Sequence, residues 1–181
     1  NHSNGNGLFR VTTPVAPAVD QPQFFTFPSG DFTDFNVSGG TTEFYDIDGT
    51  AGALYILPST VNSYGNLILT ARGGDNLVLP NIDYLKIHGD LTCTGDNSNA
   101  WIALSWSTNV APYNDNSYIT VEKTVHIKGD LYVNNGTLIY MDDIEPQHLI
   151  VDGDITVAES GRIYANAPLA GYLNIAAMPQ P

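Results

Sequence analysis

The sequence repeats one nine-residue pattern at Leu85–Cys93 (LKIHGDLTC), Val125–Val133 (VHIKGDLYV) and Leu149–Val157 (LIVDGDITV). In each copy, apolar residues occupy alternate positions on both sides of a Gly-Asp pair. A period of two is typical of a β-strand with one buried face, and an internal repeat is typical of a stacked architecture. The three segments therefore predict strands that occupy equivalent places in successive structural repeats.

The spacing of the repeats indicates their length. The Gly-Asp pairs begin at residues 89, 129 and 153, which gives intervals of 40 and 24 residues. A related segment, Gly65-Asn66-Leu67, stands 24 residues before the first pair, with Asn in place of Asp. A repeat of about 20 to 24 residues fits if the longer interval holds one divergent repeat. Its candidate strand is Trp101–Trp106, with three side chains predicted to face inward: Ile102, Leu104 and Trp106.

Repeats of this length, made of short strands and turns without a long amphipathic helix, predict an all-β fold. We expect a single-stranded parallel β-helix, or β-solenoid, of about five to seven rungs with capped ends. Alternation predicts two inward-facing sets, namely Val125, Ile127, Leu131 and Val133 in one rung and Leu149, Val151, Ile155 and Val157 in the next. The alternative fold is an antiparallel β-sandwich, which also consists of short strands between turns.

Composition divides the chain into an arm, a domain and a tail. Residues 1–22 are rich in Asn, Gly and Pro and predict a flexible N-terminal arm. Residues 23–176 predict one β-solenoid domain, with a cap at about 24–50, regular rungs at about 60–165 and a second cap at 165–176; residues 177–181 form a tail. Cys93 is the only cysteine and is predicted to be a small core residue. Because no charged-then-apolar leader precedes Asn1, we expect a trimmed form of an exported protein.

The charge of the chain excludes several classes of partner. The 19 acidic and 6 basic residues give a formal net charge of −13, and such a field repels phosphate backbones and anionic membrane surfaces. No apolar run approaches the length that a transmembrane helix needs. We therefore expect no nucleic-acid partner and no transmembrane segment. We also expect the chain to be a monomer.

The quoted repeats resemble those of right-handed β-helix proteins, in particular the acidic, Gly-Asp-Leu-rich solenoids of secreted cell-surface proteins from Bacteroidetes. The resemblance covers about residues 60–165 and carries no functional residue. It implies an extracellular or cell-surface location. With the acidic composition and the absence of a convergent catalytic set, it leads to the hypothesis of a non-enzymatic bacterial surface module that acts as a scaffold, an adhesion element or a glycan- or protein-binding element.

Aromatic residues are the clearest indication of recognition in the sequence. The chain has ten tyrosines and two tryptophans, and aromatic faces outside a polar scaffold stack on sugars or bury in protein partners. Four of them lie in or near the loop 107–117 or at an outward position and are the candidate binding residues: Trp101, Tyr113, Tyr118 and Tyr132. The alternative is that these rings pack at the corners and caps of the solenoid.

No cofactor is predicted, and calcium is the one metal that the pattern brings into question. Asp130 and Asp154 follow glycine in consecutive rungs, and two carboxylates held close together repel each other unless a cation or hydrogen-bond donors intervene. These two residues are the candidate ligands of a structural calcium ion. The alternative is that each carboxylate accepts hydrogen bonds from turn amides, as Asp often does.

A polysaccharide lyase or hydrolase, or an accessory domain of one, is the alternative function. Lys128 is outward in its rung, with Asp130 two residues on and with His88 and Asp152 at the corresponding positions of neighbouring rungs. A lyase needs a basic residue to take a proton, but the same pattern is typical of a solvated strand face. We predict no catalytic residue. A phage tail-fibre segment, which requires a trimer, is a third hypothesis.

Overall fold

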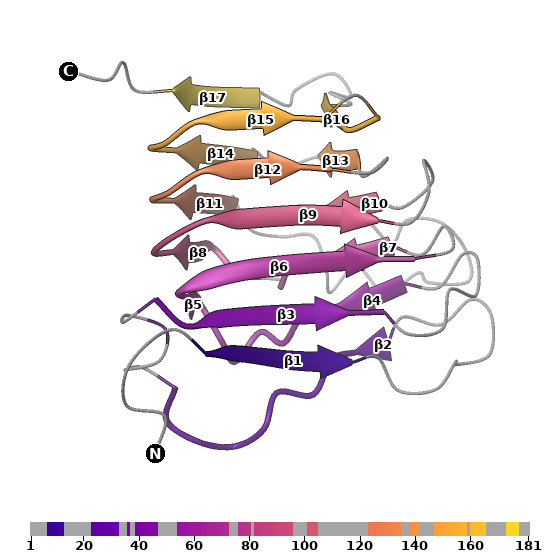
Figure 1. Ribbon diagram of the computed structural model, residues 1–181, viewed down its shortest axis with the longest axis vertical. Coiled ribbons are helices and arrows are strands. Elements are labelled where there is room, and N and C mark those ends of the chain that lie inside the picture. The colour runs from indigo at the N-terminus through magenta and orange to yellow at the C-terminus, as the bar shows by residue number, and fades with distance from the viewer. Residues whose placement is uncertain are drawn as a thin grey trace.

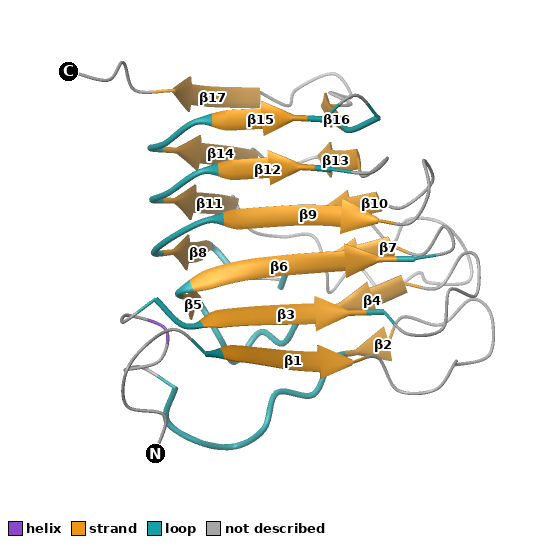
Figure 2. Ribbon diagram, viewed as in Figure 1, coloured by secondary structure: helices purple, strands orange, loops and turns teal. Residues whose placement is uncertain are grey.

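The computed structural model describes residues 7–12, 23–32, 36, 39–46, 54–72, 76–80, 82–95, 101–104, 123–134, 138–141, 147–158, 160–165 and 173–177. Within these ranges the chain is all-β (Figure 2). A helical turn at Asn36, whose N–H donates to the Phe32 carbonyl at 2.9 Å, interrupts the strands and loops. None of the described residues forms a helix with the length and hydropathy needed to cross a bilayer.

The strands form three sheets, which we call A, B and C (Figure 1). Sheet A contains β1 (Leu8–Thr12), β3 (Thr41–Tyr45), β6 (Asn66–Ala71), β9 (Leu91–Gly95), β12 (Leu131–Val133) and β15 (Ile155–Val157). Sheet B contains β2 (Gln23–Phe24), β4 (Leu54–Ile56), β7 (Asn76–Val78), β10 (Trp101–Ala103), β13 (Leu138–Met141) and β16 (Arg162–Ala165). Sheet C contains β5 (Ser63–Tyr64), β8 (Tyr84–Ile87), β11 (Lys123–Ile127), β14 (Gln147–Val151) and β17 (Leu173–Ala177).

The pairing between described strands is parallel throughout. From β3 onward, hydrogen-bonded neighbours are three strands apart in the chain, so the chain passes through sheets A, B and C in turn. Figure 1 shows the strands of sheet A stacked in chain order from β1 to β15 along the longest axis. The parallel sheets are compatible with a β-solenoid. They exclude the antiparallel sandwich for these strands, because no described pair runs in opposite directions.

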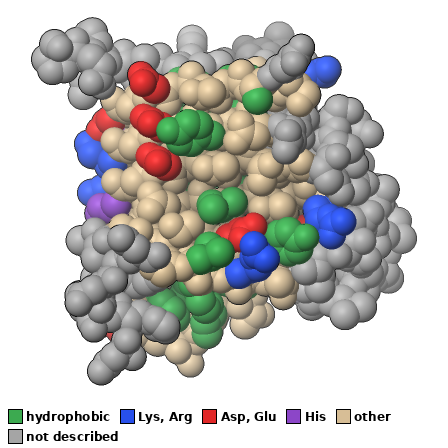
Figure 3. Space-filling view, viewed as in Figure 1, with side chains coloured by type: hydrophobic (Ala, Val, Ile, Leu, Met, Phe, Trp, Pro, Cys, Tyr) green, Lys and Arg blue, Asp and Glu red, His purple; other side chains and the backbone are tan. Residues whose placement is uncertain are grey.

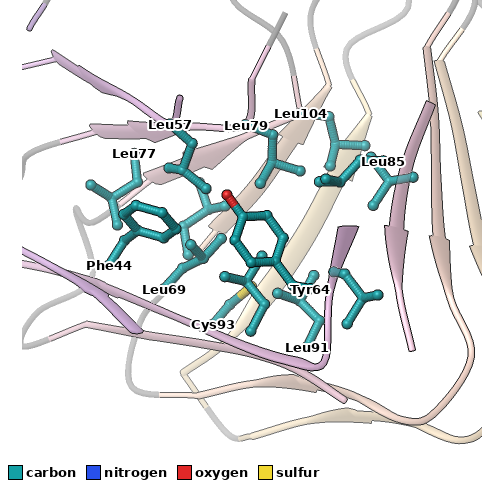
Figure 4. Packing of buried hydrophobic residues seen from close by; sticks show 14 of the residues in the cluster. Phe44, Leu57, Tyr64, Leu69, Leu77, Leu79, Leu85, Leu91, Cys93 and Leu104 are labelled. Carbon is teal, nitrogen blue, oxygen red and sulfur yellow. The ribbon is translucent and has the colours of Figure 1, made fainter. Parts of the chain in front are cut away.

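The core lies between the three sheets and consists of stacked apolar columns. Leu67, Leu91 and Leu131 occupy one register position of β6, β9 and β12 and are at most 1% exposed. Figure 4 shows aliphatic side chains around the Tyr64 ring in this interior. Each buried aliphatic side chain contributes roughly 1.5 to 3 kcal/mol, and stacked strands lie about 4.8 Å apart, so one rung covers the apolar face of the next.

The predicted inward positions that the structure describes are confirmed except in β15. Six are fully buried: Val125, Ile127, Leu131, Val133, Leu149 and Val151. Cys93 is also buried, as predicted, and burial raises the pKa of its thiol. Ile155 is only partly buried, and Val157 is 44% exposed. Both belong to β15, which is the last strand of sheet A among the described residues, and an inward residue is fully covered only when a further strand stacks on it.

The 40-residue interval holds one pass through the three sheets, so the predicted divergent repeat is wrong. The Gly129 N–H donates to the Gly89 carbonyl at 2.9 Å, and β12 pairs directly with β9. Trp101–Ala103 is the sheet B strand of that same pass, as β10. Ile102 and Leu104 are buried as predicted, each 1% exposed, whereas Trp106 lies outside the described residues. The extra length falls between β10 and β11.

The predicted N-terminal arm and cap are corrected in part. Leu8–Thr12, inside the expected arm, form β1 and pair in parallel with β3. Val11 is 8% exposed, so alternation gives even this short segment a buried face. β3 itself, placed in the expected cap, is an internal strand of sheet A. Residues 25–32 do cover the end of the stack, because Phe27 and Phe32 pack on Phe9 of β1 with ring centroids 5.4 and 5.6 Å away.

Candidate binding surface on sheet C

The Gly-Asp pairs build a continuous column at the corner that leads into sheet A. We call this column the aspartate ladder; its members are Asn66, Asp90, Asp130 and Asp154. The Oδ1 atom of each of the first three accepts a hydrogen bond from the backbone N–H of the next, at 3.0, 2.9 and 2.8 Å in order. Each side chain therefore satisfies a backbone donor one rung away, and the ladder joins successive rungs.

The glycine before each aspartate is required by the same contact. A Cβ atom built at Gly89 would lie 2.1 Å from Asn66 Oδ1, and one at Gly129 or Gly153 would lie 2.2 Å from the Asp oxygen below it. The backbone of the neighbouring glycine lies within 2.8 Å of the last two Cβ positions. No side chain fits there, which explains why Gly and Asp recur together in the sequence.

The candidate calcium ligands belong to this ladder. Asp130 Oδ1 accepts from the Asp154 amide, and Asp130 Oδ2 accepts from the Tyr132 hydroxyl at 2.8 Å. The amide bond, followed by the tyrosine bond, lowers the pKa of Asp130, and the same contact raises the pKa of Tyr132. The alternative to a calcium site was that each carboxylate accepts hydrogen bonds from turn amides. Asp130 does accept hydrogen bonds, but its donors are the Asp154 amide and the Tyr132 hydroxyl. Among the described residues no three His, Cys, Asp or Glu side chains converge as metal ligands.

The sequence-predicted binding residues do not form a described cluster. Tyr132 alternates with the buried Leu131 and Val133 and so lies on the outer face of sheet A, where its hydroxyl donates to Asp130. Figure 3 shows acidic side chains gathered on this face of the molecule. Trp101 belongs to β10 in sheet B, and Tyr113 and Tyr118 lie outside the described residues. The binding role of this set therefore stays a prediction. The described residues place a different group of polar side chains together, on the outer face of sheet C.

The outer face of sheet C carries the densest group of described basic side chains. We call it the sheet C surface and define it by Tyr84, Lys86, His88, Thr124, His126, Lys128, His148, Ile150 and Asp152. These residues alternate with the buried ones of β8, β11 and β14 or follow those strands directly. Two of the three lysines and three of the four histidines of the chain are here, with one carboxylate. The chain as a whole has a net charge of −13, but on this face basic side chains outnumber acidic ones.

A hydrogen-bonded network crosses three rungs of this surface. The Tyr84 hydroxyl is 2.9 Å from His126 Nδ1, and His126 Nε2 is 3.0 Å from Asp152 Oδ1. Lys128 Nζ forms an ion pair with the other carboxylate oxygen of Asp152. If ionised Asp152 accepts the Nε2 proton, Nδ1 is left as the acceptor for the tyrosine hydroxyl. The ring of His126 is therefore held at both nitrogens.

The pKa values on this surface follow from its contacts. The Lys128 bond, and then the His126 bond, lower the pKa of Asp152, so this carboxylate stays ionised under mildly acidic conditions. Partial burial, and then the charge of Lys86, lower the pKa of His88, whose Nε2 lies 3.0 Å from Ser63 Oγ. Protonation of His88 is therefore less favourable than that of a histidine free in solution.

Sequence analysis missed the central members of this network. The sequence pattern indicates His88 only as a neighbour of Lys128 on a solvated strand face, and it gives no reason to single out His126 or Tyr84. The available signal was the repeat alignment, which places Lys86 and His126 in one column and His88, Lys128 and Asp152 in the next. The predicted neighbour of Lys128 was Asp130, but the ion pair is made with Asp152 because Asp130 turns to the other side of the corner and binds Tyr132.

One lysine, Lys123, is buried and so does not belong to an outer face. Lys123 is 2% exposed, and its Nζ donates to the carbonyl oxygens of Pro80 and Leu104, each at 2.5 Å. It begins β11 at an inward position, where the sequence pattern gives no warning of a charged side chain. Lys123 therefore links sheet C to the ends of two sheet B segments and is unavailable to a ligand on the surface.

Comparisons with protein-family models, with curated proteins and with solved structures give no match. The candidate site therefore depends on the geometry of this chain alone.

Proposed function

We propose that the chain is a β-solenoid module of an extracellular bacterial surface protein and that it binds rather than catalyses. The parallel sheets support the solenoid, which in this proposal winds as successive rungs around one apolar core. The observation that carries a binding role is the sheet C surface, where lysine and histidine side chains gather beside Tyr84, 43% exposed, on an otherwise acidic chain. An extended, nearly flat sheet face suits an extended partner.

The ligand class that this surface fits best is an acidic glycan. Lysine and protonated histidine attract carboxylates, and an exposed tyrosine ring offers a face on which a sugar ring stacks. The attraction is screened by salt, so binding is expected to weaken as ionic strength rises. The Lys128 and His126 contacts lower the pKa of Asp152, so the one carboxylate of this surface stays paired with its basic neighbours at neutral pH.

A matched pair of variants tests this proposal. Lys86→Gln removes one positive charge from the sheet C surface, and Thr92→Glu, at an outward position of sheet A, changes the net charge of the chain by the same amount. Binding to immobilised polygalacturonate is expected to drop several-fold in Lys86→Gln and little in Thr92→Glu. Equal losses in the two variants would indicate a bulk charge effect, and no binding by the parent chain would refute the proposal.

The Tyr84–His126–Asp152 network favours a second candidate, a polysaccharide lyase. In that reaction a base removes the proton next to a uronate carboxylate, and the glycosidic oxygen leaves with the electron pair, which creates a carbon–carbon double bond. His126, held by Asp152, is the group positioned to exchange a proton with Tyr84. Ultraviolet absorbance of acidic polysaccharides incubated with the chain, with and without calcium, distinguishes the two candidates: unsaturated products that Tyr84→Phe abolishes support the lyase.

A further inference from the structure

A pocket of about 600 Å³ opens at the N-terminal end of the stack. One wall is the segment 27–32, whose aromatic side chains pack on β1, the first strand of sheet A. The other is the segment 60–63, which leads into β5, the first strand of sheet C. Its volume lies within the range of small-molecule sites in proteins.

We propose that this pocket binds one neutral sugar ring, such as a terminal hexose of a glycan. The inference concerns a different site from the sheet C surface and does not depend on the function proposed for that surface. Four lining residues supply the recognising groups, namely Phe27, Phe32, Thr60 and Asn62, and two more, Asn36 and Ser63, bond to each other across the wall.

The lining combines apolar rings with uncharged hydrogen-bonding groups. Phe27 and Phe32 lie edge to face with centroids 4.8 Å apart, and they offer apolar surface to the C–H face of a pyranose. Thr60 and Asn62 are exposed at the same pocket and carry a hydroxyl and an amide, which pair with sugar hydroxyls. A purely apolar ligand would leave these polar groups unpaired, whereas a sugar has one face for the rings and hydroxyls for the rest.

Asn36 fixes one wall of the pocket through a hydrogen bond to Ser63. The residue is 6% exposed, and its Nδ2 donates to the Ser63 carbonyl at 2.7 Å, which fixes the orientation of the amide. The Asn36–Ser63 bond therefore holds Asn36 against the segment 60–63, which forms the other wall of the pocket.

The charge of the pocket selects a neutral ligand over an acidic one. Asp31 is the charged residue among those that line it, and no lysine, arginine or histidine is in that set. A uronate or a phosphate would therefore find no cationic side chain among the lining residues. The ligand class therefore differs from the acidic glycan that suits the sheet C surface.

The experiment measures binding of the methyl glycosides of glucose, galactose and mannose, with methyl glucuronide as the acidic comparison, to the full chain by saturation-transfer NMR and calorimetry. Asn62→Trp fills the mouth of the pocket from an exposed position. Ser59→Trp places the same ring on an exposed neighbour that does not line it. Circular dichroism and melting temperature, expected to be unchanged in both, establish that the variants are folded.

We expect at least one neutral glycoside to bind, with affinity reduced about tenfold or more in Asn62→Trp and within about twofold of the parent in Ser59→Trp. Methyl glucuronide should bind more weakly than the neutral glycoside. Absence of binding by all three neutral glycosides, unchanged binding in Asn62→Trp, or preference for the glucuronide would overturn the inference. Lys86→Gln, which tests the sheet C surface, should leave neutral glycoside binding intact, so the two proposals fail separately.

Discussion

The aspartate ladder and the sheet C surface are both columns of polar residues that run through the same rungs, but their bonds have different partners. In the ladder each carboxylate or amide oxygen accepts from the backbone of the next rung. On the sheet C surface, Tyr84, His126, Lys128 and Asp152 bond to one another's side chains.

This difference separates a structural column from a candidate binding one. A ladder side chain that is removed leaves a backbone donor without its partner, and that loss acts on the fold. A surface side chain that is removed leaves groups that water can solvate, so the fold tolerates the change and a ligand can take the place of the lost contact. Four changes test this contrast, starting with the core that both columns enclose.

The largest effect is expected from Ile127→Asp. Ile127 is fully buried between Ile87 and Val151, and an unpaired charge there costs several kcal/mol, which should prevent cooperative unfolding in urea. Lys128→Asp, one residue on, is the control. It loses the ion pair and places a second carboxylate beside Asp152, so we expect a folded protein with a lowered midpoint. Equal cooperativity of Ile127→Asp and the parent would contradict a stacked interior.

The next largest effect is expected from Gly129→Ala. The added methyl group meets Asp90 Oδ1 and the Gly89 backbone, which cannot both move without disturbing the neighbouring rung. Overpacking of this kind costs about 1 to 3 kcal/mol, measured as the change in the free energy of unfolding by urea. Gly39→Ala gives a comparison in which the methyl group enters open space but the φ of 93° imposes backbone strain. A tolerated Gly129→Ala would show that the ladder contact is not a constraint.

A direct comparison of Asp130→Ala with Asp152→Ala comes third. Asp130→Ala leaves the Asp154 amide without its acceptor and should lower the melting temperature by a few degrees. Asp152→Ala releases Lys128 and His126 to solvent and should lower it less, while it changes glycan binding more. Asp130→Asn should stay close to the parent, because Asn66 already performs the same task in the ladder. A larger drop in melting temperature in Asp152→Ala than in Asp130→Ala would contradict the structural role of the aspartate ladder.

The smallest effect is the dependence of stability on pH. Asp130 and Asp152 have lowered pKa values, so their contribution is complete above the unfolded value of about 4 and is lost as the pH falls through the folded values. His88, whose pKa is also lowered, contributes above about 6.5 and loses that contribution as the pH falls. Urea midpoints from pH 8 to pH 3, compared between the parent and Asp130→Asn or His88→Gln, isolate each group. If the urea midpoint of the parent depended on pH in the same way as that of both variants, neither Asp130 nor His88 would contribute to the pH dependence of stability.

Much of the fold was predictable because burial in a stacked sheet has a strict period of two. Val125 and Ile127 alternate with His126 and Lys128, and the pattern alone gives the strand, its inner face and its equivalents in neighbouring rungs. The 40-residue interval was misinterpreted because an insertion between strands lengthens one rung without adding a strand to sheet C. The first strand was missed because Leu8–Thr12 is short and stands among Asn, Gly and Pro residues.

The candidate site was less predictable from the sequence. At the turn between sheets C and A, residues that are close in sequence can lie on the outer faces of different sheets. Lys128 and Asp130 are two residues apart, yet they contribute to different sheet faces. The pocket between segments 27–32 and 60–63 depends on contacts across some thirty residues of sequence, for which no periodic signal exists.

By itself the sequence determined the strands, most of their inward residues and the recurrence of the Gly-Asp pair, because alternation and repetition are visible along the chain. Only the tertiary structure decided that Asp130 closes a backbone ladder, that Asp152 joins His126 to Lys128, and that Asn36 lies in the wall of a pocket. The physical reason is distance along the chain: hydrogen bonds between rungs join residues 24 to 42 positions apart, and their partners are fixed only when the rungs stack.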